Sequence, residues 1–390
     1  MLIETLQPLG LGVSLRLMDA PALGAALRAA MPGWPLSRWP ARAALSRQLC
    51  AWHEREAYYM PVPNRPRPVR LTGVAAAACG VIADLIPLVL DHWPEAIGLH
   101  CAAVEVEGRL LVFPATHRAG KSVLATAFAA AGYRVFADDV LVLTPDGQGM
   151  ALGISPRIRR PLPALDPRLA RFIADHEAVS DHRYRYVDPG PARLAAHGER
   201  RPLGAIVLLE RLPGAEPTLM PLPPGEGLLR LLSQSLADRR QPDVLLKRLL
   251  PMMHALPCRL LRYDEPMAAV ERIAAVGRDG GIAPAVETAG SEEAERSVPS
   301  DLTWRRRAVE AEYPLHDELF LIDDRGRVHR LSAVAAGIWR LLGTEPLSRA
   351  EVVTLLAARF PGTERSRLAA DVAAFLDEAS RLALIAPAES

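Results

Sequence analysis

The stretch FPATHRAGKSVLATAF, residues 113–128, places Gly-Lys-Ser between an apolar run and a helical pattern. The run before it, Arg109–Phe113, is predicted to be a strand, and the helix is predicted to begin at Gly120 and to end at Gly132. A helix N-terminus that follows a strand is the setting in which main-chain N–H groups wrap a phosphate. The pattern A-x-x-x-x-G-K-S is therefore predicted to bind nucleotide phosphate through Ala115, Thr116, His117, Arg118, Ala119, Gly120, Lys121 and Ser122.

Lysine is rare in this chain, because 44 of its 46 basic residues are arginine and only Lys121 and Lys247 are lysine. One of the two therefore falls inside the Gly-Lys-Ser motif. In a phosphate loop the lysine reaches the terminal phosphates and the hydroxyl takes Mg²⁺. Lys121 and Ser122 are assigned these roles. Alanine replaces the first glycine of the usual pattern, which is acceptable where the backbone does not need a positive φ.

An acidic pair, Asp138-Asp139, follows the next predicted strand, YRVFA. Phosphate transfer to a hydroxyl needs a carboxylate for Mg²⁺ and a carboxylate that accepts the proton. The pair supplies both, and the sequence leaves open which residue has which role. The alternative without a catalytic role is an acidic turn exposed to solvent. A histidine at residue 100, just before the first strand, is on its own more often structural than functional.

The composition favours a protein with a buried core and no general affinity for polyanions. The chain has 390 residues, 50% of them hydrophobic, and a net charge of +1, so two or three domains are expected. The four cysteines show no CxxC spacing, which favours reduced thiols and the cytoplasm. No secretory signal is expected at the N-terminus, and the apolar run Val74–Leu90 is predicted to be a buried helix rather than a membrane span.

These residues together resemble the kinase domain of bacterial HPr kinase/phosphorylase and its relatives. The likeness rests on LHCAAVEVEGRLLVFPATHRAGKSVLATAFAAAGYRVFADD, which contains His100, Ala115–Ser122 and the Asp138-Asp139 pair. It implies a phosphoenolpyruvate-carboxykinase-like α/β fold, with a P-loop, that uses ATP and Mg²⁺ to phosphorylate a serine, in an oligomer whose subunit count is not fixed. His117 and Arg118 depart from the Ser-Gly that is usual in the family's loop.

On this resemblance, Asp138 is assigned as the base, Asp139 as a ligand of Mg²⁺ with Ser122, and His100 as a neighbour of the transferred phosphate. Residues 1–95 are expected to be the N-terminal part of the kinase region, and residues 96–277 its catalytic domain. Three arginines that follow in GISPRIRRPLP are candidate phosphate or substrate contacts, or a solvated basic loop: Arg157, Arg159 and Arg160. The segment DHRYRYVDP, residues 181–189, is predicted to be a substrate-facing loop or an edge strand.

The C-terminal part is predicted to be a separate small α+β domain. Residues 278–301 have no apolar period and are predicted to be a flexible linker to a domain at 302–390. A hairpin and three helices, the second with a capping box, indicate a winged-helix shape. Residues 305–389 hold 12 arginines and 13 acidic residues, which argues against a DNA-binding face.

This domain resembles the PqqD family, the peptide-recognition element of ribosomal peptide maturation. The likeness lies in the hairpin, in HRLSAVAAGIWRLL and in the terminal helix that runs into LALIAP, with Ser332 where the family often has asparagine. In that family a leader peptide adds a strand at the sheet edge, in a groove against the last helix. The resemblance therefore assigns peptide binding to Val328, His329, Arg330, Leu331, Leu368, Val372 and Phe375.

The two resemblances together predict a kinase that phosphorylates a serine of a ribosomally synthesised precursor peptide, of the lasso-peptide type. The tether to the recognition domain would raise the effective concentration of the substrate at the active site. Neither nucleic acid nor membrane is an expected partner. The alternatives are a degenerate kinase fold that acts as a peptide-binding scaffold, a serine kinase for a carrier protein such as HPr, and a DNA-binding regulator.

Overall fold

The structure of the chain is a computed structural model that describes residues 1–38, 47–61, 66–114, 119–162, 165–236, 242–278 and 302–388. The described residues contain ten helices and several sheets, so the mixed α/β class is confirmed. Contacts divide the chain into two compact units. Unit 1 comprises Met1–Leu222, Ser233–Asp238 and Leu256–Pro284, and unit 2 comprises Pro223–Leu232, Arg239–Ala255 and Ala285–Ser390.

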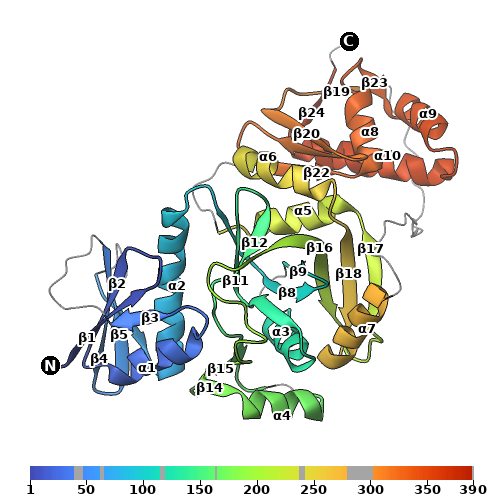
Figure 1. The fold of residues 1–390 in the computed structure, drawn as a ribbon. Helices are drawn as coiled ribbons and strands as arrows, with labels where there is room; N and C mark the ends of the chain where they lie inside the picture. The colour runs from blue at the N-terminus through green and yellow to red at the C-terminus, as the bar shows by residue number, and fades with distance from the viewer. Residues whose placement is uncertain are drawn as a thin grey trace. The chain divides into compact units, whose positions relative to one another are not determined.

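Unit 1 begins with a six-stranded sheet, shown in blue in Figure 1, that the sequence did not lead us to predict. Its order is β3-β1-β2-β4-β5-β6, mostly antiparallel with one parallel pair, β2 and β4. The strands are β1 (Ile3–Pro8), β2 (Val13–Met18), β3 (Leu36–Arg38), β4 (Arg47–Glu54), β5 (Ala57–Met60) and β6 (Val69–Leu71). Two helices, α1 (Pro21–Ala30) and α2 (Val74–His92), pack against each other and against this sheet.

Helix α2 is the predicted apolar helix, and it is part of the core. Its buried residues include Ala77, Val81 and Leu85, which pack in the same cluster as Leu15 and Leu27. Among the described residues, this helix alone has the length and composition to cross a membrane. Burial of one side in a core accounts equally well for such a composition.

The second sheet of unit 1 has nine strands and carries the motifs singled out above. Its order is β10-β8-β9-β16-β12-β11-β7, with β18 beside β16 and β17 beside β18. The strands are β7 (Ile97–His100), β8 (Ala102–Val106), β9 (Arg109–Phe113), β10 (Arg134–Ala137), β11 (Val140–Leu143), β12 (Gln148–Met150), β16 (Arg200–Arg211), β17 (Thr218–Leu222) and β18 (Cys258–Tyr263). The predicted hairpin of β8 and β9 is confirmed, with positive φ at Glu107 (51°) and Gly108 (74°) as a tight turn requires.

Three helices complete this part of unit 1: α3 (Lys121–Ala130), α4 (Pro167–Asp175) and α7 (Pro266–Arg278). Helix α3 contacts both α4 and α7, and its Leu124 and Phe128 are buried with Phe113 of β9. Figure 1 shows α3 and α7 side by side along the sheet. The helix predicted from Gly120 to Gly132 is confirmed, because α3 begins after Gly120 and the chain turns at Gly132 with φ 95°.

A small third sheet of unit 1 corrects the prediction for residues 181–189. It has the order β13-β15-β14, formed by β13 (Arg157–Arg159), β14 (Glu177–Ser180) and β15 (Tyr184–Val187). The predicted loop or edge strand is therefore the central strand. Its register places Tyr186 opposite Arg157 and buries the Tyr186 ring, which alternation of Arg and Tyr alone does not reveal.

Unit 2 contains the predicted hairpin and three helices. Its main sheet has the order β20-β21-β22, from β20 (Ala311–Leu315), β21 (Glu318–Ile322) and β22 (Val328–Leu331). The helices are α8 (Ala333–Leu341), α9 (Arg349–Arg359) and α10 (Arg365–Arg381), and the capping box of Ser348 with Glu351 is confirmed. A second sheet, β23-β19-β24, joins β19 (Thr303–Arg306), β23 (Leu347–Ser348) and β24 (Ile385–Pro387).

Two further helices of unit 2 come from the middle of the chain: α5 (Pro224–Ser233) and α6 (Pro242–Met253). Helix α6 contacts β20, and the Tyr313 hydroxyl of β20 hydrogen-bonds to Asp243. Both helices lie within the predicted domain 96–277, but their contacts assign them to unit 2, which contains the predicted domain 302–390. The predicted domain limits therefore differ from the division in the structure. The predicted linker at 278–301 lies outside the described residues except for Arg278, which ends α7.

Candidate functional site

The Gly-Lys-Ser motif occupies the junction of β9 and α3. Gly120 has φ 88°, and a β-carbon added there would lie 3.2 Å from the Tyr263 hydroxyl, so both the backbone and its neighbour favour glycine. Lys121 and Ser122 open the helix, and a helix N-terminus is the end that favours anions. Ala115–Arg118, the preceding part of the predicted loop, lie outside the described residues.

The Lys121 side chain is buried, with an exposed fraction of 8%. Burial lowers the pKa of Lys121, and the charges of Asp138 and Asp139 oppose that effect. A buried ammonium group is costly without compensating negative charge. The two aspartates therefore lie where they stabilise the lysine, as the predicted site requires.

Asp138 follows β10 and is buried, with 7% of its surface exposed. Its Oδ2 accepts a hydrogen bond of 2.8 Å from the main-chain N–H of Arg157. Burial raises the pKa of Asp138 to about 6, against smaller opposing effects from the Arg157 N–H group and the Ser122 side chain. A carboxylate with this pKa is ionised at neutral pH and still basic enough to accept a proton.

Asp139 is held between the side chains of His100 and Arg157. Its Oδ1 lies 3.0 Å from His100 Nε2, and its Oδ2 lies 3.3 Å from Arg157 Nη2. Burial acts to raise the pKa of Asp139, but the hydrogen bond from His100 and the charge of Arg157 outweigh it, and the pKa is lowered. The neighbouring aspartates therefore differ in their protonation behaviour, although the sequence does not distinguish them.

His100 reaches Asp139 because of the strand pairing. Register places His100, the last residue of β7, opposite Val140 of β11, directly after the acidic pair. The His100 main-chain N–H donates to the Gln234 carbonyl at 2.8 Å, and the Cys101 N–H donates to the Asp139 carbonyl at 3.1 Å. The histidine that was ambiguous on its own is thus brought into the predicted site.

Of the three arginines predicted as substrate contacts, the structure brings only Arg157 to the acidic pair. The Arg157 guanidinium also lies 4.6 Å from the centre of the Tyr184 ring. Burial acts to lower the pKa of Arg157, but neighbouring acidic groups, Cys79 and Tyr186 first, raise it. Arg159 and Arg160 are exposed, and Arg160 donates to the Asp181 carbonyl at 3.1 Å.

Several residues around the site are not marked by any sequence motif. The Tyr263 hydroxyl is buried beside Gly120 and has no hydrogen-bond partner among the described residues, and burial raises its pKa to about 12. Cys79 and Tyr186 lie beside Arg157. No local pattern signals them, because they come from α2, β15 and β18, and long-range packing brings them to the motif.

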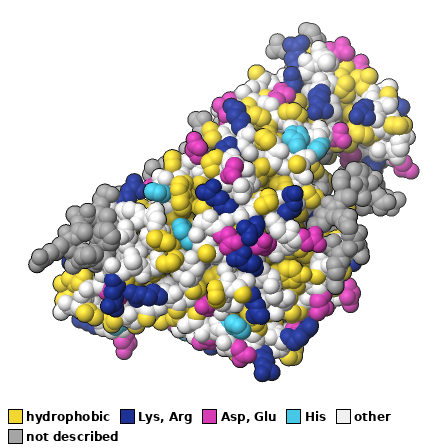
Figure 2. Space-filling view, in the orientation of Figure 1, with side chains coloured by type: hydrophobic (Ala, Val, Ile, Leu, Met, Phe, Trp, Pro, Cys, Tyr) yellow, Lys and Arg dark blue, Asp and Glu magenta, His cyan; other side chains and the backbone are white. Residues whose placement is uncertain are grey.

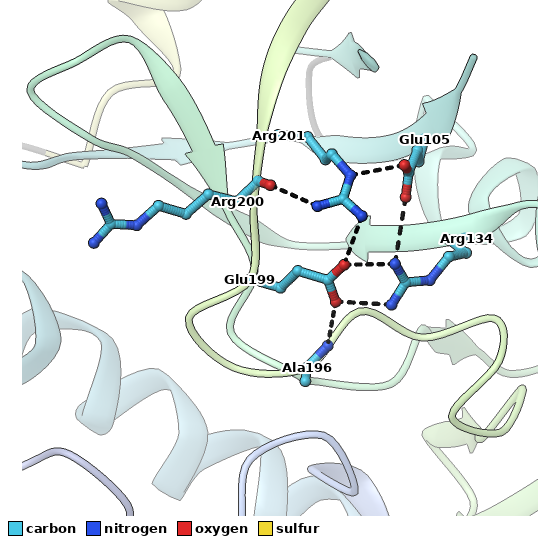
Figure 3. Close-up of polar contacts among 6 residues, drawn as sticks. All are labelled: Glu105, Arg134, Ala196, Glu199, Arg200 and Arg201. Atoms are coloured by element: carbon cyan, nitrogen blue, oxygen red, sulfur yellow. Dashed lines mark hydrogen bonds and ion pairs between the residues drawn. The ribbon is translucent and has the colours of Figure 1, made fainter. Parts of the chain in front are cut away.

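An ion-pair network fixes β10, the strand that precedes the acidic pair (Figure 3). Arg134, the first residue of β10, binds both carboxylate oxygens of Glu199 at 2.5 and 2.7 Å and lies 3.4 Å from Glu105 of β8. Arg201 of β16 binds Glu105 at 2.7 Å and Glu199 at 3.0 Å. Paired, half-buried arginines and glutamates of this geometry hold three strands in register. Charges elsewhere are intermixed on the face shown in Figure 2.

The oxygen groups fit a magnesium-bound nucleotide better than a resident metal. Ser122, Asp138 and Asp139 offer oxygen ligands, and Asp138 Oδ1 is buried with no hydrogen-bond partner among the described residues. Those residues contain no group of three or more His, Cys, Asp or Glu that could hold a metal ion by itself. Mg²⁺ commonly takes one or two carboxylates together with the phosphates of its substrate.

In unit 2 the predicted peptide-binding strand, β22, is at the edge of its sheet. Its pairing partner among the described strands is β21 on one side only. His329 Nε2 lies 2.9 Å from Asp323 Oδ2, and Arg330 binds Glu318 and Glu226. On α10, Leu368 and Val372 are fully buried in the helical core and so support the helix, whereas Phe375 is half-buried.

Comparison with known protein families gives a match in this same region. Residues 318–385 match the family model described as Coenzyme PQQ synthesis protein D (PqqD). No curated protein matched the chain. The match spans β21, β22 and the helices α8 to α10, and it implies a peptide-binding role in the maturation of precursor peptides. The C-terminal part of this chain is a PqqD-like domain.

Proposed function

We propose that the chain is an ATP-dependent kinase that phosphorylates a serine hydroxyl of a ribosomally synthesised precursor peptide, of the lasso-peptide type. One observation carries the proposal. Lys121 and Ser122, at a helix N-terminus, lie near Asp138, whose pKa is raised, and Asp139, whose pKa is lowered. The PqqD-like domain supports the peptide as the partner. Cytoplasmic location and self-association remain predictions.

In this proposal each residue has a distinct task. Lys121 and the first N–H groups of α3 hold the terminal phosphates. Asp139 keeps its charge near neutral pH because its pKa is lowered, and with Ser122 it is assigned to Mg²⁺. Mg²⁺, when bound, neutralises charge on the phosphates. Asp138 accepts the proton of the serine hydroxyl while the hydroxyl oxygen bonds to the γ-phosphorus and the bond to the ADP oxygen breaks.

His100 and Arg157 position Asp139 in this scheme. Each contacts a different oxygen of the carboxylate, so the rotation of the side chain is fixed from both sides. The Arg157 N–H group fixes Asp138 at the same time. Arg157 therefore sets the geometry of both aspartates, a role beyond the substrate contact that its sequence position indicates.

The proposed peptide site is the edge of β22 that pairs with no described strand, together with Phe375 of α10. An added strand there would hydrogen-bond to the main chain and place side chains against Phe375. Phosphate transfer to synthetic precursor peptides, each with its leader intact, tests the function, with phosphorylation read by mass spectrometry. A second function, a peptide-binding scaffold without catalysis, is favoured by the family match alone, and absence of transfer to any precursor together with peptide binding would support it.

Replacing Phe375 with glutamate should raise the KM for a leader-bearing peptide by about 10- to 100-fold, because a contact at the centre of an interface is worth about 1–3 kcal/mol. The kcat should stay unchanged, since Phe375 is in unit 2. Leu355→Glu on α9 is the matched control, because Leu355 is 44% exposed and lies outside the proposed groove. Equal KM values for the two variants would contradict peptide binding at this edge.

A further inference from the structure

Arg211 lies at the edge of the nine-stranded sheet where β9 ends. Strands β9, β16 and β18 run parallel and are neighbours in the sheet, so their carboxyl ends lie at one edge (Figure 1). Register pairs Ile206 of β16 with Val112, the penultimate residue of β9, whereas β16 continues to Arg211. Strand β16 therefore extends beyond the end of β9. Ligands of open α/β sheets commonly bind outside the carboxyl ends of such strands.

The Arg211 side chain is on the face of the sheet that α3 covers. Alternate residues of a strand point to one face, and Val207 and Leu209, which precede Arg211 at this spacing, pack with the buried side chains of α3. A β-carbon added to Gly120 would lie 3.9 Å from Arg211 Cδ and 3.2 Å from the hydroxyl of Tyr263, the residue opposite Arg211. Burial raises the pKa of Tyr263 to about 12 and the Arg211 charge opposes that effect, so the guanidinium lies near this hydroxyl and the glycine of the motif.

The Arg211 guanidinium is held in place by one hydrogen bond and keeps other donors for a ligand. Its Nε donates to the Asp264 carbonyl at 2.9 Å, and its Nη2 lies 3.9 Å from Asp264 Oδ1. Asp264 Oδ2 accepts from the Gly214 N–H at 2.8 Å. Among the described residues, no hydrogen bond engages either terminal nitrogen of Arg211, although a guanidinium has five N–H donors. The side chain is 31% exposed, so an anion can reach it.

A nucleotide at this motif needs positive charge beyond that of Lys121. A magnesium-bound triphosphate keeps a net negative charge, and the carboxyl groups of Asp138 and Asp139 add to it. Arg157 already contacts Asp139 at 3.3 Å, so part of its charge is used there. Sites of phosphoryl transfer often supply a further arginine that stabilises charge on the phosphates. Arg211 lies where it can supply that charge.

We propose that Arg211 is a second cationic contact of the nucleotide, whose guanidinium binds oxygens of the terminal phosphates beside Gly120. The inference rests on the proposed function only for the presence of a nucleotide, and it does not depend on the acceptor. The planar guanidinium binds two phosphate oxygens at once, which a lysine ammonium group does not. It also stabilises the negative charge on the diphosphate as the bond from the γ-phosphorus to the diphosphate oxygen breaks.

Calorimetric titration of the full chain with ATP·Mg²⁺ tests this contact. Arg211→Gln should weaken binding about 10- to 100-fold, the usual value of a hydrogen bond to a charged group. Arg262→Gln is the matched control, because Arg262 of β18 is opposite Glu210, points to the other face of the sheet and pairs with Glu210 at 2.6 Å. The control should bind ATP as the wild type does. Equal losses in the two variants, or no loss in Arg211→Gln, overturn the proposal.

Inorganic triphosphate with Mg²⁺ assigns the contact to the phosphates, because this probe has neither base nor sugar. Its affinity for the full chain should fall in Arg211→Gln by about the factor found for ATP. A loss for ATP without a loss for triphosphate places Arg211 against another part of the nucleotide and overturns the proposal. Absence of triphosphate binding to the wild type overturns it as well.

Arg211→Lys separates a phosphate contact from a structural role. Lysine keeps the charge without the planar fork, so its affinity for ATP should lie between those of the wild type and Arg211→Gln. The urea midpoints of the three proteins should agree, because the ion pair with Asp264 is long and exposed to solvent. Equal affinities in the two variants, or a loss of affinity that follows a lowered urea midpoint, indicate a structural role and overturn the contact.

Phosphate transfer to a precursor peptide distinguishes this inference from the proposed function. In Arg211→Gln the kcat/KM for ATP should fall at least about tenfold, and the KM for the peptide should stay unchanged. If ATP affinity depends on Arg211 but the wild type transfers no phosphate, the kinase function fails and the contact stands. If the wild type transfers phosphate and Arg211→Gln has the same kcat/KM for ATP, the contact fails and the kinase function stands.

Discussion

Replacing Asp138 with asparagine should reduce phosphate transfer to a precursor peptide by about 10²- to 10⁴-fold, the usual contribution of a positioned general base. Asparagine has nearly the same shape and still accepts the hydrogen bond from the Arg157 N–H group, but it takes no proton. In the wild type, kcat/KM should rise as pH increases through about 6, the pKa of Asp138, because the carboxylate must be ionised to act. The variant should lack this rise.

The same substitution should stabilise the protein above pH 6. Burial raises the pKa of Asp138 from 3.8 to about 6, so the folded state favours the protonated acid. The stability that this group contributes is present below pH 4 and is lost as pH rises through 6. A difference of about two pKa units corresponds to about 3 kcal/mol. The gain in stability from Asp138→Asn should therefore grow as pH rises from 4 to 7, up to a limit of about 3 kcal/mol that loss of the negative charge beside the buried Lys121 reduces.

Urea unfolding at both pH values, together with initial transfer rates, measures these two effects. Asp175→Asn is a suitable control, because Asp175 lies on the exposed face of α4 and its side chain is 60% exposed. It should change neither quantity measurably. An Asp138→Asn variant that transfers phosphate at the wild-type rate contradicts its assignment as the base, whatever its stability.

Replacing Glu318 with leucine should destabilise unit 2 by about 3–5 kcal/mol, because it leaves a buried charge without its main partner. Glu318 is 6% exposed, its Oε1 lies 2.8 Å from Arg330 Nε, and its Oε2 accepts from the Gly225 N–H at 2.6 Å. Arg330 Nη1 also binds Glu226 at 2.6 Å. This cluster joins the sheet of the PqqD-like domain to the first turn of α5.

Hydrogen exchange of the main-chain amides in β20 to β22 measures that loss of stability locally. Glu310→Leu, at an exposed position in the same unit, should leave exchange unchanged. The double variant Glu318→Leu/Arg330→Met should recover part of the loss, since it removes both buried charges. Faster exchange in Glu310→Leu than in Glu318→Leu would contradict a structural role for this cluster.

Local sequence patterns predicted the elements that carry the motif. The Glu107-Gly108 turn, the glycines that flank α3 and the short spacing from strand to acidic pair are each defined by a few consecutive residues. The strands and helix were therefore recognisable without knowledge of the rest of the chain. The same holds for the Ser348 capping box and the hairpin of β21 and β22.

Contacts between distant residues were not predictable in this way. The N-terminal sheet depends on the pairing of short strands, several of only three to six residues, which carry little local signal. Arg157 acquires its role from a main-chain bond to Asp138, 19 residues earlier, and from Tyr186 on another strand. Glu226 and Arg330 are 104 residues apart, so α5 could be assigned to unit 2 only from the structure.

The most direct test of the central claim is a calorimetric titration of the full chain with ATP·Mg²⁺, with Lys121→Ala and Lys247→Ala in parallel. Lys247 is the only other lysine, and its side chain is 62% exposed on α6. The account predicts wild-type binding with a dissociation constant between about 1 μM and 1 mM, retained in the Lys247 variant and weakened at least about tenfold in Lys121→Ala. No binding to the wild type, or equal binding to all three, would contradict a nucleotide site at Lys121.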